Sequence, residues 1–188
     1  MPKIIKNLDE TIRKKTFKLF SEKGYDGVDI KLIAKECGMA VGTFYNYYSS
    51  KMELFMDILD KSWKETFKKI EESKMENLTV RERLEVQIEI LYDDIENRKG
   101  LGFYIQQKYI FNSNKATEMT NLNDVIVCNI KQIFEPLSKK SCFNAIEDVN
   151  ERLGYTLILQ ITKCLAMYPE KKCENLKFIK SLILSLVV

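Results

Sequence analysis

A short stretch near residue 45 concentrates hydrogen-bonding side chains, an unusual feature for a merely solvated helix surface. An asparagine amide can pair bidentately with adenine, and a valine methyl can contact the methyl group of thymine. The residues of the stretch are Val41, Gly42, Thr43, Tyr45, Asn46, Tyr47 and Lys51. They predict a surface that recognises a nucleic acid without covalent chemistry, with Val41 and Asn46 as the candidates to touch base edges.

Two short helices joined by a tight turn are predicted to position this surface. Asp29 can cap the first helix, because its carboxylate accepts from backbone N–H groups that no carbonyl reaches. Apolar residues then recur at helical spacing, at Ile30, Ile33, Ala34 and Cys37. Gly38 can take the left-handed conformation that ends a helix. Two helices around such a turn fit a helix-turn-helix, whose second helix enters the DNA major groove.

The second helix is expected within residues 41–47, with Phe44 and Tyr48 turned toward the core. A sequence of the form S-x-x-E, from Ser50 to Glu53, is typical of a capping box and predicts the start of a longer helix. The recognition surface is therefore expected between two well-defined helix boundaries.

These residues resemble the DNA-binding segment of the TetR family of bacterial one-component repressors. The family pattern combines an I-A pair, G-[VM], small-x-G-T-[LF]-Y-x-[HY]-F and a lysine that opens the next helix, preceded by L-F-x-x-x-G-[YF]. The matching residues are Ile33-Ala34, Gly38-Met39, Ala40-Val41-Gly42-Thr43-Phe44-Tyr45-Asn46-Tyr47-Tyr48, Lys51 and, upstream, Leu19-Phe20-Ser21-Glu22-Lys23-Gly24-Tyr25. The resemblance covers residues 6–66.

The chain departs from the family pattern at three places. Ala40 replaces the common serine or threonine before the recognition helix, so that the usual side-chain cap is missing. Tyr48 stands where phenylalanine is usual, and Lys15-Thr16 replace an alanine pair, so we expect looser packing of the first helix. None of the three removes an expected DNA contact.

The resemblance implies specific roles for the recognition residues. Thr43, Tyr45, Tyr47 and Lys51 would hold phosphates and fix the helix in the groove. Gly42 would let the backbone approach DNA closely. The implied function is a ligand-responsive repressor that binds a near-palindromic operator as a homodimer.

An all-α fold is expected, with a helix-turn-helix head and a helical body, in about nine helices. The domains are predicted as residues 1–50, with the helix-turn-helix at 29–48, and residues 51–188 for effector binding and dimerisation. Body helices are expected at 51–73, 79–97 and 115–134, then from an N-cap at Asn144 to Pro169, and finally to the end of the chain.

The last two predicted helices carry more apolar surface than one core contact requires. Such an excess indicates burial against another subunit, and the resemblance implies a four-helix bundle with the twofold mate. The predicted dimer residues are Leu153, Leu157, Ile161, Leu165, Ile179, Leu182, Ile183 and Leu186.

Aromatic residues are spread over the helices that enclose the family's ligand pocket. For each one taken singly, an ordinary core position remains the alternative. As a set, they favour a small apolar or aromatic effector, because ligand pockets are mostly apolar. The residues are Trp63, Phe67, Tyr92, Phe103, Tyr104, Tyr109, Phe111, Met119 and Phe134.

Composition supports a globular DNA-binding protein. Apolar residues make up 45% of the chain and charged residues 30%. The formal net charge is +3, and residues 1–64 account for all of it, with 12 Lys or Arg against 9 Asp or Glu. Phosphate attraction would need positive charge in that part. No signal peptide or membrane span is evident, so a cytoplasmic location is expected.

Little in the sequence favours catalysis, a cofactor or a metal. The chain has no histidine, which is the commonest general base and metal ligand. Its five cysteines form no C-x-x-C pair, so buried reduced thiols are expected. Two alternatives stay open: a helical small-molecule carrier or enzyme with an incidental head, and a DNA-binding regulator that responds to thiol oxidation, with Cys164 and Cys173 as the strongest candidates.

Overall fold

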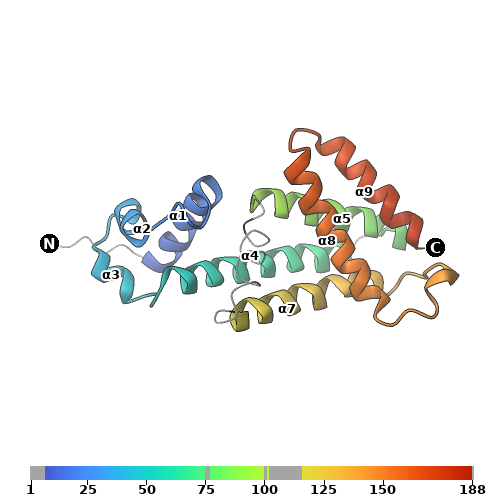
Figure 1. Ribbon diagram of the computed structural model, residues 1–188, viewed down its shortest axis with the longest axis horizontal. Coiled ribbons are helices and arrows are strands. Elements are labelled where there is room, and N and C mark those ends of the chain that lie inside the picture. Colours follow the sequence, from blue (N-terminus) through green and yellow to red (C-terminus); the bar gives the residue numbers. More distant parts are fainter. Residues whose placement is uncertain (1–6, 75–76, 100, 102–115, 188) are drawn as a thin grey trace.

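Figure 1 shows the computed structural model, in which a small helical head and a larger helical body share one long helix. The structure describes residues 7–74, 77–99, 101 and 116–187. Within these ranges it contains eight α-helices and a short 3₁₀ helix, against the nine helices predicted, and it has no strand beyond an isolated bridge. The all-α prediction is confirmed. No described helix combines the length and apolarity that crossing a lipid bilayer requires.

The head consists of α1 (Leu8–Lys23), α2 (Ile30–Cys37) and α3 (Val41–Tyr45), packed on the start of α4 (Lys51–Ser73). Its core is built on an aromatic cluster. The Phe20 ring stacks on Tyr25 at 5.6 Å between centroids, and Phe55 of α4 meets both rings edge-on, at 5.2 and 5.0 Å. This arrangement fixes α4 to the head.

The boundaries of the helix-turn-helix follow the predicted signals. The Asp29 carboxylate accepts from the Leu32 N–H at 2.7 Å, which satisfies one of the free amides of α2. Gly38 ends α2 in the left-handed conformation, at φ 68°. The predicted cap and turn are therefore confirmed.

The start of α4 differs in detail from the predicted capping box. The Ser50 hydroxyl accepts from the Glu53 N–H at 3.1 Å, as expected. The Glu53 carboxylate, however, accepts from the N–H and hydroxyl of Ser49, at 2.7 and 2.6 Å, and not from the Ser50 N–H. The helix still begins at the predicted residue.

The body contains α5 (Val80–Asn97), α7 (Ala116–Phe134), α8 (Val149–Met167) and α9 (Lys172–Leu186) beside the second half of α4. The start of α5 has the full reciprocal capping box predicted from Thr79 and Glu82. Helices α8 and α9 form an antiparallel pair that crosses the body (Figure 1). Pro169 follows the end of α8, as predicted.

The predicted N-cap at Asn144 is wrong. Residues Ser141–Phe143 form the 3₁₀ helix, and the Asn144 N–H donates to the Ser141 carbonyl at 3.1 Å. The Ile146 N–H likewise donates to Phe143, at 2.9 Å. Because these groups are already used by the turn, α8 begins at Val149, with Asp148 as its N-cap residue at φ 53°.

Helix α4 contributes to two separate hydrophobic cores. Its first half places Leu54 to Leu59 in the core of the head, whereas Trp63 and Ile70 belong to the core of the body. The change occurs within about one turn of helix. The division at residue 50 stays a prediction, and α4 is an element that both parts share.

Candidate nucleic-acid interface

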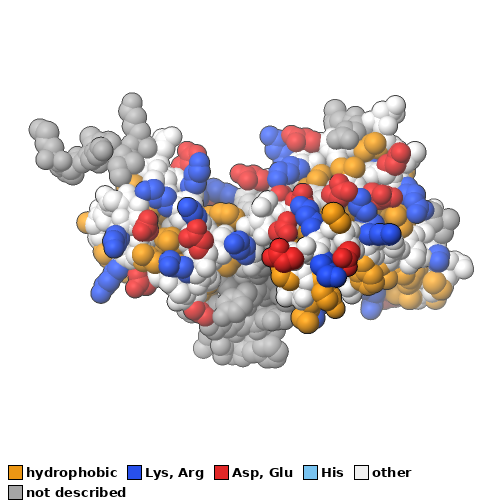
Figure 2. Space-filling view, turned by 90° about the horizontal axis from the view of Figure 1, so that it is seen from above, with side chains coloured by type: hydrophobic (Ala, Val, Ile, Leu, Met, Phe, Trp, Pro, Cys, Tyr) orange, Lys and Arg blue, Asp and Glu red, His pale blue; other side chains and the backbone are white. Residues whose placement is uncertain are grey.

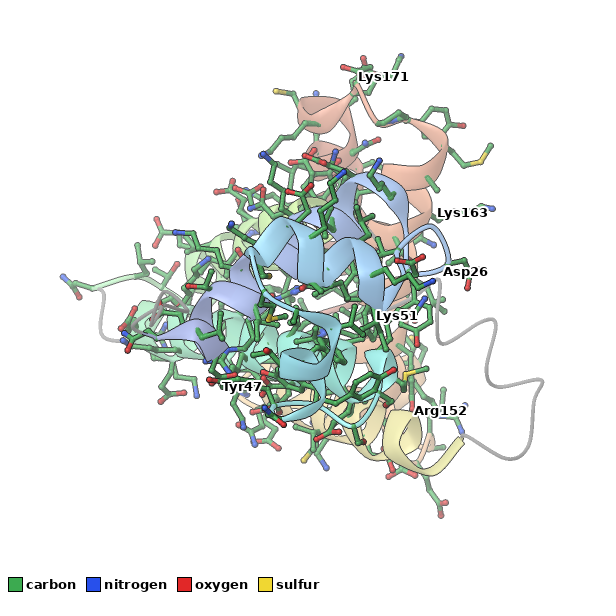
Figure 3. All side chains as sticks on the ribbon, turned by 90° about the vertical axis from the view of Figure 1, so that its left-hand side faces the viewer. Asp26, Tyr47, Lys51, Arg152, Lys163 and Lys171 are labelled. Atoms are coloured by element: carbon green, nitrogen blue, oxygen red, sulfur yellow. The ribbon has the colours of Figure 1, made fainter. Side chains whose placement is uncertain are left out.

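Helix α3 separates an apolar face from a polar one. Phe44 is fully buried and Tyr48 nearly so, whereas Tyr45 and Tyr47 are 54% and 43% exposed. Val41, Gly42 and Asn46 are also exposed, and Thr43 is half-buried. Figure 3, which looks at the molecule from the head end, shows Tyr47 and Lys51 to either side of α3. The surface predicted from the sequence is thus assembled at one end of the molecule.

The N-terminus of α3 has no side-chain cap. Ala40 has the extended backbone of an N-cap residue, with φ −72° and ψ 151°, but no oxygen to accept from the first amides. The helix is five residues long, too short to be stable alone, so that packing must hold it in place. Its position depends on Phe44 and Tyr48.

The Tyr48 hydroxyl joins α1 to α4 beneath the recognition helix. It donates to the Asp9 and Asp57 carboxylates, with O–O distances of 2.7 and 2.9 Å, and Arg13 approaches it at 3.2 Å. Arg13 also pairs with Asp9 and, at 3.3 Å, with Asp57. Burial, together with the two carboxylate partners, raises the pKa of Tyr48, so its hydroxyl keeps its proton. The departure from phenylalanine therefore gives the head a partly buried polar clamp.

Lys51 makes its described contacts within the head. Its ammonium donates to the carbonyls of Tyr25 and Val28, at 2.8 and 2.7 Å, and lies 4.0 Å above the Tyr25 ring. Lys51 thus ties the turn before α2 to the start of α4. Its predicted role as a phosphate ligand stays a prediction, and any such contact has to be made alongside these two hydrogen bonds.

The two residues of α1 that depart from the family pattern, Lys15 and Thr16, differ in their hydrogen bonding. Thr16 is fully buried in the head, but its hydroxyl has no hydrogen-bond partner. Lys15 donates to the carbonyl of Glu36 at 2.6 Å, so it links α1 to the end of α2. Looser packing of α1 was expected; the described atoms show a tightly enclosed side chain with an unsatisfied polar group.

The predicted effector residues include buried core residues, one half-buried residue and several that the structure does not describe. Trp63, Tyr92 and Phe134 are buried in the body core, and half-buried Phe67 stacks on Trp63 at 5.5 Å. The remaining residues were Phe103, Tyr104, Tyr109 and Phe111, which lie outside the described residues, and Met119, whose side chain lies outside them. Two surface grooves, of about 470 and 340 Å³, are lined by other residues. The pocket stays a prediction.

A buried polar cluster between α4 and α5 was not predicted. Arg98, the residue after α5, is 3% exposed and donates to Ser62 and Thr66 of α4. Thr66 donates to Asp94, which also accepts from Lys69. The sequence signal was the Asp94–Arg98 spacing of four residues, which on its own is typical of a solvated helix surface.

Most of the predicted dimer residues belong to the protomer's own core. Leu153, Leu157, Ile161, Ile179 and Ile183 are buried there; Leu165, Leu182 and Leu186 are half-buried. The periodicity therefore identified the inner face of α8 and α9. Their outward face carries a different set of exposed apolar side chains, namely Tyr155, Leu159, Met167, Tyr168 and Phe178. Hydrophobic side chains also gather at the body end in Figure 2, at lower right.

The cysteines are all free, but their environments differ. Cys37 and Cys164 are buried, and burial raises the pKa of each thiol, which lowers the fraction of reactive thiolate. Cys128, Cys142 and Cys173 are exposed, so the prediction of buried thiols is wrong for these three. Of the two cysteines considered for redox sensing, Cys164 is therefore disfavoured by its surroundings.

Residues 12–58 match the family described as bacterial regulatory proteins, tetR family. Over 95 residues, the chain is 33% identical to the uncharacterized HTH-type transcriptional regulator YuxN of Bacillus subtilis, covering 50% of this chain and 33% of YuxN. Over 112 residues, it is 25% identical to the HTH-type transcriptional repressor KstR of Mycobacterium tuberculosis, covering 59% of this chain and 51% of KstR. The matched parts thus span about a third to a half of these relatives.

The whole fold is similar to that of the regulator FadR from Bacillus subtilis, solved in complex with stearoyl-CoA. The TM-score is 0.68 at 17% identity, and the match covers 94% of this chain and 96% of FadR. At this identity the likeness concerns the fold alone. With the recognition helix in place, residues 12–58 of the head match the tetR family of bacterial regulatory proteins, and the fold of the whole chain is similar to that of a solved transcriptional regulator.

Proposed function

We propose that this protein is a ligand-responsive transcriptional repressor that binds a near-palindromic DNA operator as a homodimer. The observation that carries the proposal is the separation, over α3 and the residues that follow it, of the buried Phe44 and Tyr48 from the exposed Tyr45, Asn46 and Tyr47. The match of residues 12–58 to the tetR family supports it independently. The chain has no catalytic role in this proposal, and its place is the cytoplasm, where its operator would be.

Each exposed group of α3 has a role in the proposed complex. The hydroxyls of Thr43, Tyr45 and Tyr47 bind phosphate oxygens and set the orientation of the helix. Val41 and Asn46 contact base edges, which gives sequence preference. Gly42 lies on the exposed side, and no described atom within 4 Å would oppose a Cβ there, so its value is the close approach it allows to DNA.

The dimer is proposed to form through the outward face of α8 and α9. Leu159 and Phe178 are 50% and 55% exposed, and Tyr155 lies one turn before Leu159. A twofold axis would pair the same surface of each copy. Such a dimer would hold its two heads about 34–36 Å apart, so that both enter successive major grooves on one side of the duplex.

An apolar or aromatic compound is the proposed effector. The aromatic residues Trp63, Phe67 and Tyr92 of the body provide apolar surface of the kind that lines ligand sites. FadR, which has a similar fold, was solved with stearoyl-CoA. Fatty acyl compounds are therefore the first class to test.

The proposed control of DNA binding is a population shift. An effector that binds better to a form with a different head spacing lowers the operator affinity, by no more than its difference in affinity for the two forms. Helix α4 is suited to couple the sites, because one rigid element belongs to both cores.

Selection from a random duplex pool tests the proposed function. The purified protein is expected to enrich an inverted repeat whose half-sites have centres about 10–10.5 base pairs apart, or a multiple of that. Binding should weaken steeply as salt increases, because phosphate contacts release counterions. Recovery of a pool without any common sequence would contradict the proposal and favour a carrier or an enzyme.

A further inference from the structure

The two hydrophobic cores meet along α4 at a polar junction. Leu59 is the last α4 residue in the head core, and Trp63 is the first in the body core. Ser62 lies between them. The guanidinium of Arg98 is placed against this point: its Nε donates to the Ser62 hydroxyl at 2.7 Å, and Nη2 donates to the Ser62 carbonyl at 2.8 Å.

Arg98 is fixed on its other sides as well. Nη2 also donates to the Thr66 hydroxyl, and the guanidinium carbon lies 4.1 Å above the Trp63 ring. Nη1, however, is buried and has no hydrogen-bond partner among the residues that the structure describes. Buried polar groups are almost always paired, so an unpaired N–H on a residue that is 97% buried needs an explanation.

The charge of Arg98 has no direct ion pair among the described residues, although the charges of Asp94 and Glu65 act on it from a distance. The nearby Asp94 carboxylate is occupied, since its Oδ2 accepts from Thr66 and its Oδ1 from Lys69, each at 2.7 Å. No described carboxylate forms an ion pair with Arg98. Burial lowers the pKa of Arg98 to about 10, which leaves the side chain protonated at neutral pH. A buried cation of this kind is stabilised when an anion joins it.

We propose that Arg98 binds an oxyanion of the effector, a carboxylate or a phosphate group, at the junction of the two cores. The free Nη1–H supplies a charge-assisted hydrogen bond. Beside it, Trp63 is buried in the body core, and the half-buried Phe67, which stacks on Trp63, provides apolar surface for the rest of the effector. The effector class is therefore an amphipathic acid, which goes beyond the apolar compound proposed above and depends on that proposed function.

This site would also connect the effector to α4. An anion bound at Nη1 would pull the guanidinium away from Ser62 and Thr66, which its Nε and Nη2 now hold. Weakening those bonds loosens the hold of α5 on α4 one turn beyond the head core. The result is a direct physical link between effector binding and the position of the heads.

Binding of three probes to the full-length dimer tests the proposal. The probes are decanoate, decanoyl-CoA and neutral methyl decanoate, below their micelle concentrations, measured by calorimetry. We expect at least one anionic probe to bind about tenfold or more tightly than the methyl ester, the size expected for a lost charged hydrogen bond. Decanoate and decanoyl-CoA distinguish a carboxylate from phosphate. Equal binding of all three, or binding of none, would overturn the proposal.

Arg98→Gln is expected to remove the preference for the anion, and Arg98→Lys to keep part of it. The matched control is Arg81→Gln in α5, where the side chain is 69% exposed and pairs with Glu85. In wild-type protein the Arg98 Nε–H NMR signal should shift with the anionic probe. If the signal stays in place, or Arg98→Gln binds all probes like wild type, Arg98 is only a structural clamp.

Operator binding without a probe distinguishes failure of the Arg98 site from failure of the proposed regulator function. If wild type and Arg98→Gln both bind the operator, the regulator function stands, whatever the probes show. If wild type binds no DNA sequence, the proposed function itself fails.

Discussion

At the scale of single residues, the head depends on one hydroxyl that the family pattern does not require. The Tyr48 hydroxyl donates to Asp9 of α1 and to Asp57 of α4. It therefore joins three segments of the head beneath the helix that would meet DNA. The sequence indicated that Tyr48 is buried, from its spacing with Phe44. It could not show the hydroxyl's partners, because Asp9 and Arg13 come from α1 and approach only after folding.

Tyr48→Phe is expected to lower the free energy of unfolding by about 1–2 kcal/mol, because two carboxylates lose a buried donor. Urea denaturation followed by circular dichroism measures the change. Tyr155→Phe on α8 is the control, since that ring is exposed. Unchanged stability of Tyr48→Phe would mean that the hydroxyl does not clamp the head.

The same cluster predicts a dependence on pH. Burial alone would raise the pKa of Asp9, but hydrogen bonds from Arg13 and Tyr48, with the charge of Arg13, bring it below its ordinary value of 3.8. A lowered pKa in the folded state stabilises the protein above pH 3.8, and this contribution is lost as the pH falls through the lowered value.

Asp9→Asn should therefore be less stable than wild type at pH 7, and the difference should shrink below about pH 4. Because Asp9 is 46% exposed, the loss at neutral pH is expected to stay under about 1 kcal/mol. Denaturation at pH 7, 5 and 3.5 measures it. A difference that grows on acidification would have the wrong sign.

At the scale of elements, local signals in the sequence predicted helix ends well. Asp29, Gly38, Ser50 and Thr79 act where their types and spacing indicated. The prediction at Asn144 was wrong because a 3₁₀ turn used the same backbone groups. The apolar periodicity identified the inner face of α8 and α9, and the predicted dimer contacts stay a prediction, since periodicity cannot tell the protomer's own core from a partner.

The missing cap of α3 gives a prediction for this element. Ala40→Ser should stabilise the head by about 0.5–1 kcal/mol, because the hydroxyl can accept from a free amide of the first turn. Thermal denaturation measures the change. Ala40→Val, which keeps a side chain there without an acceptor, is the control, and equal behaviour of the two variants would contradict the prediction.

At the scale of the whole molecule, two heads can act together only if the bodies associate. The outward face of α8 and α9 provides the proposed surface, and its exposed apolar side chains are costly to leave in water. Arg98 lies elsewhere, at the junction of the two cores. Its role could not be predicted from the sequence, because its hydrogen-bond partners belong to α4.

Leu159→Asp combined with Phe178→Asp should produce a monomer, because a twofold interface would bring four added charges together. Light scattering at micromolar concentration measures the mass. The control replaces Lys163 of α8 and Lys171, the N-cap residue of α9, by Asp, which adds negative charge without removing apolar surface. If the double variant stays dimeric, the interface does not lie on the outward face of α8 and α9.

The affinity of the selected operator for a Tyr45→Ala and Tyr47→Ala double variant tests the central claim most directly. Both rings point outward, whereas Lys51 also supports the fold, so these two changes report on the recognition surface. Fluorescence anisotropy should show at least about 30-fold weaker binding, which corresponds to two lost hydrogen bonds of about 1 kcal/mol each. Dimer mass and melting temperature should stay the same. Wild-type affinity in this variant would contradict the account.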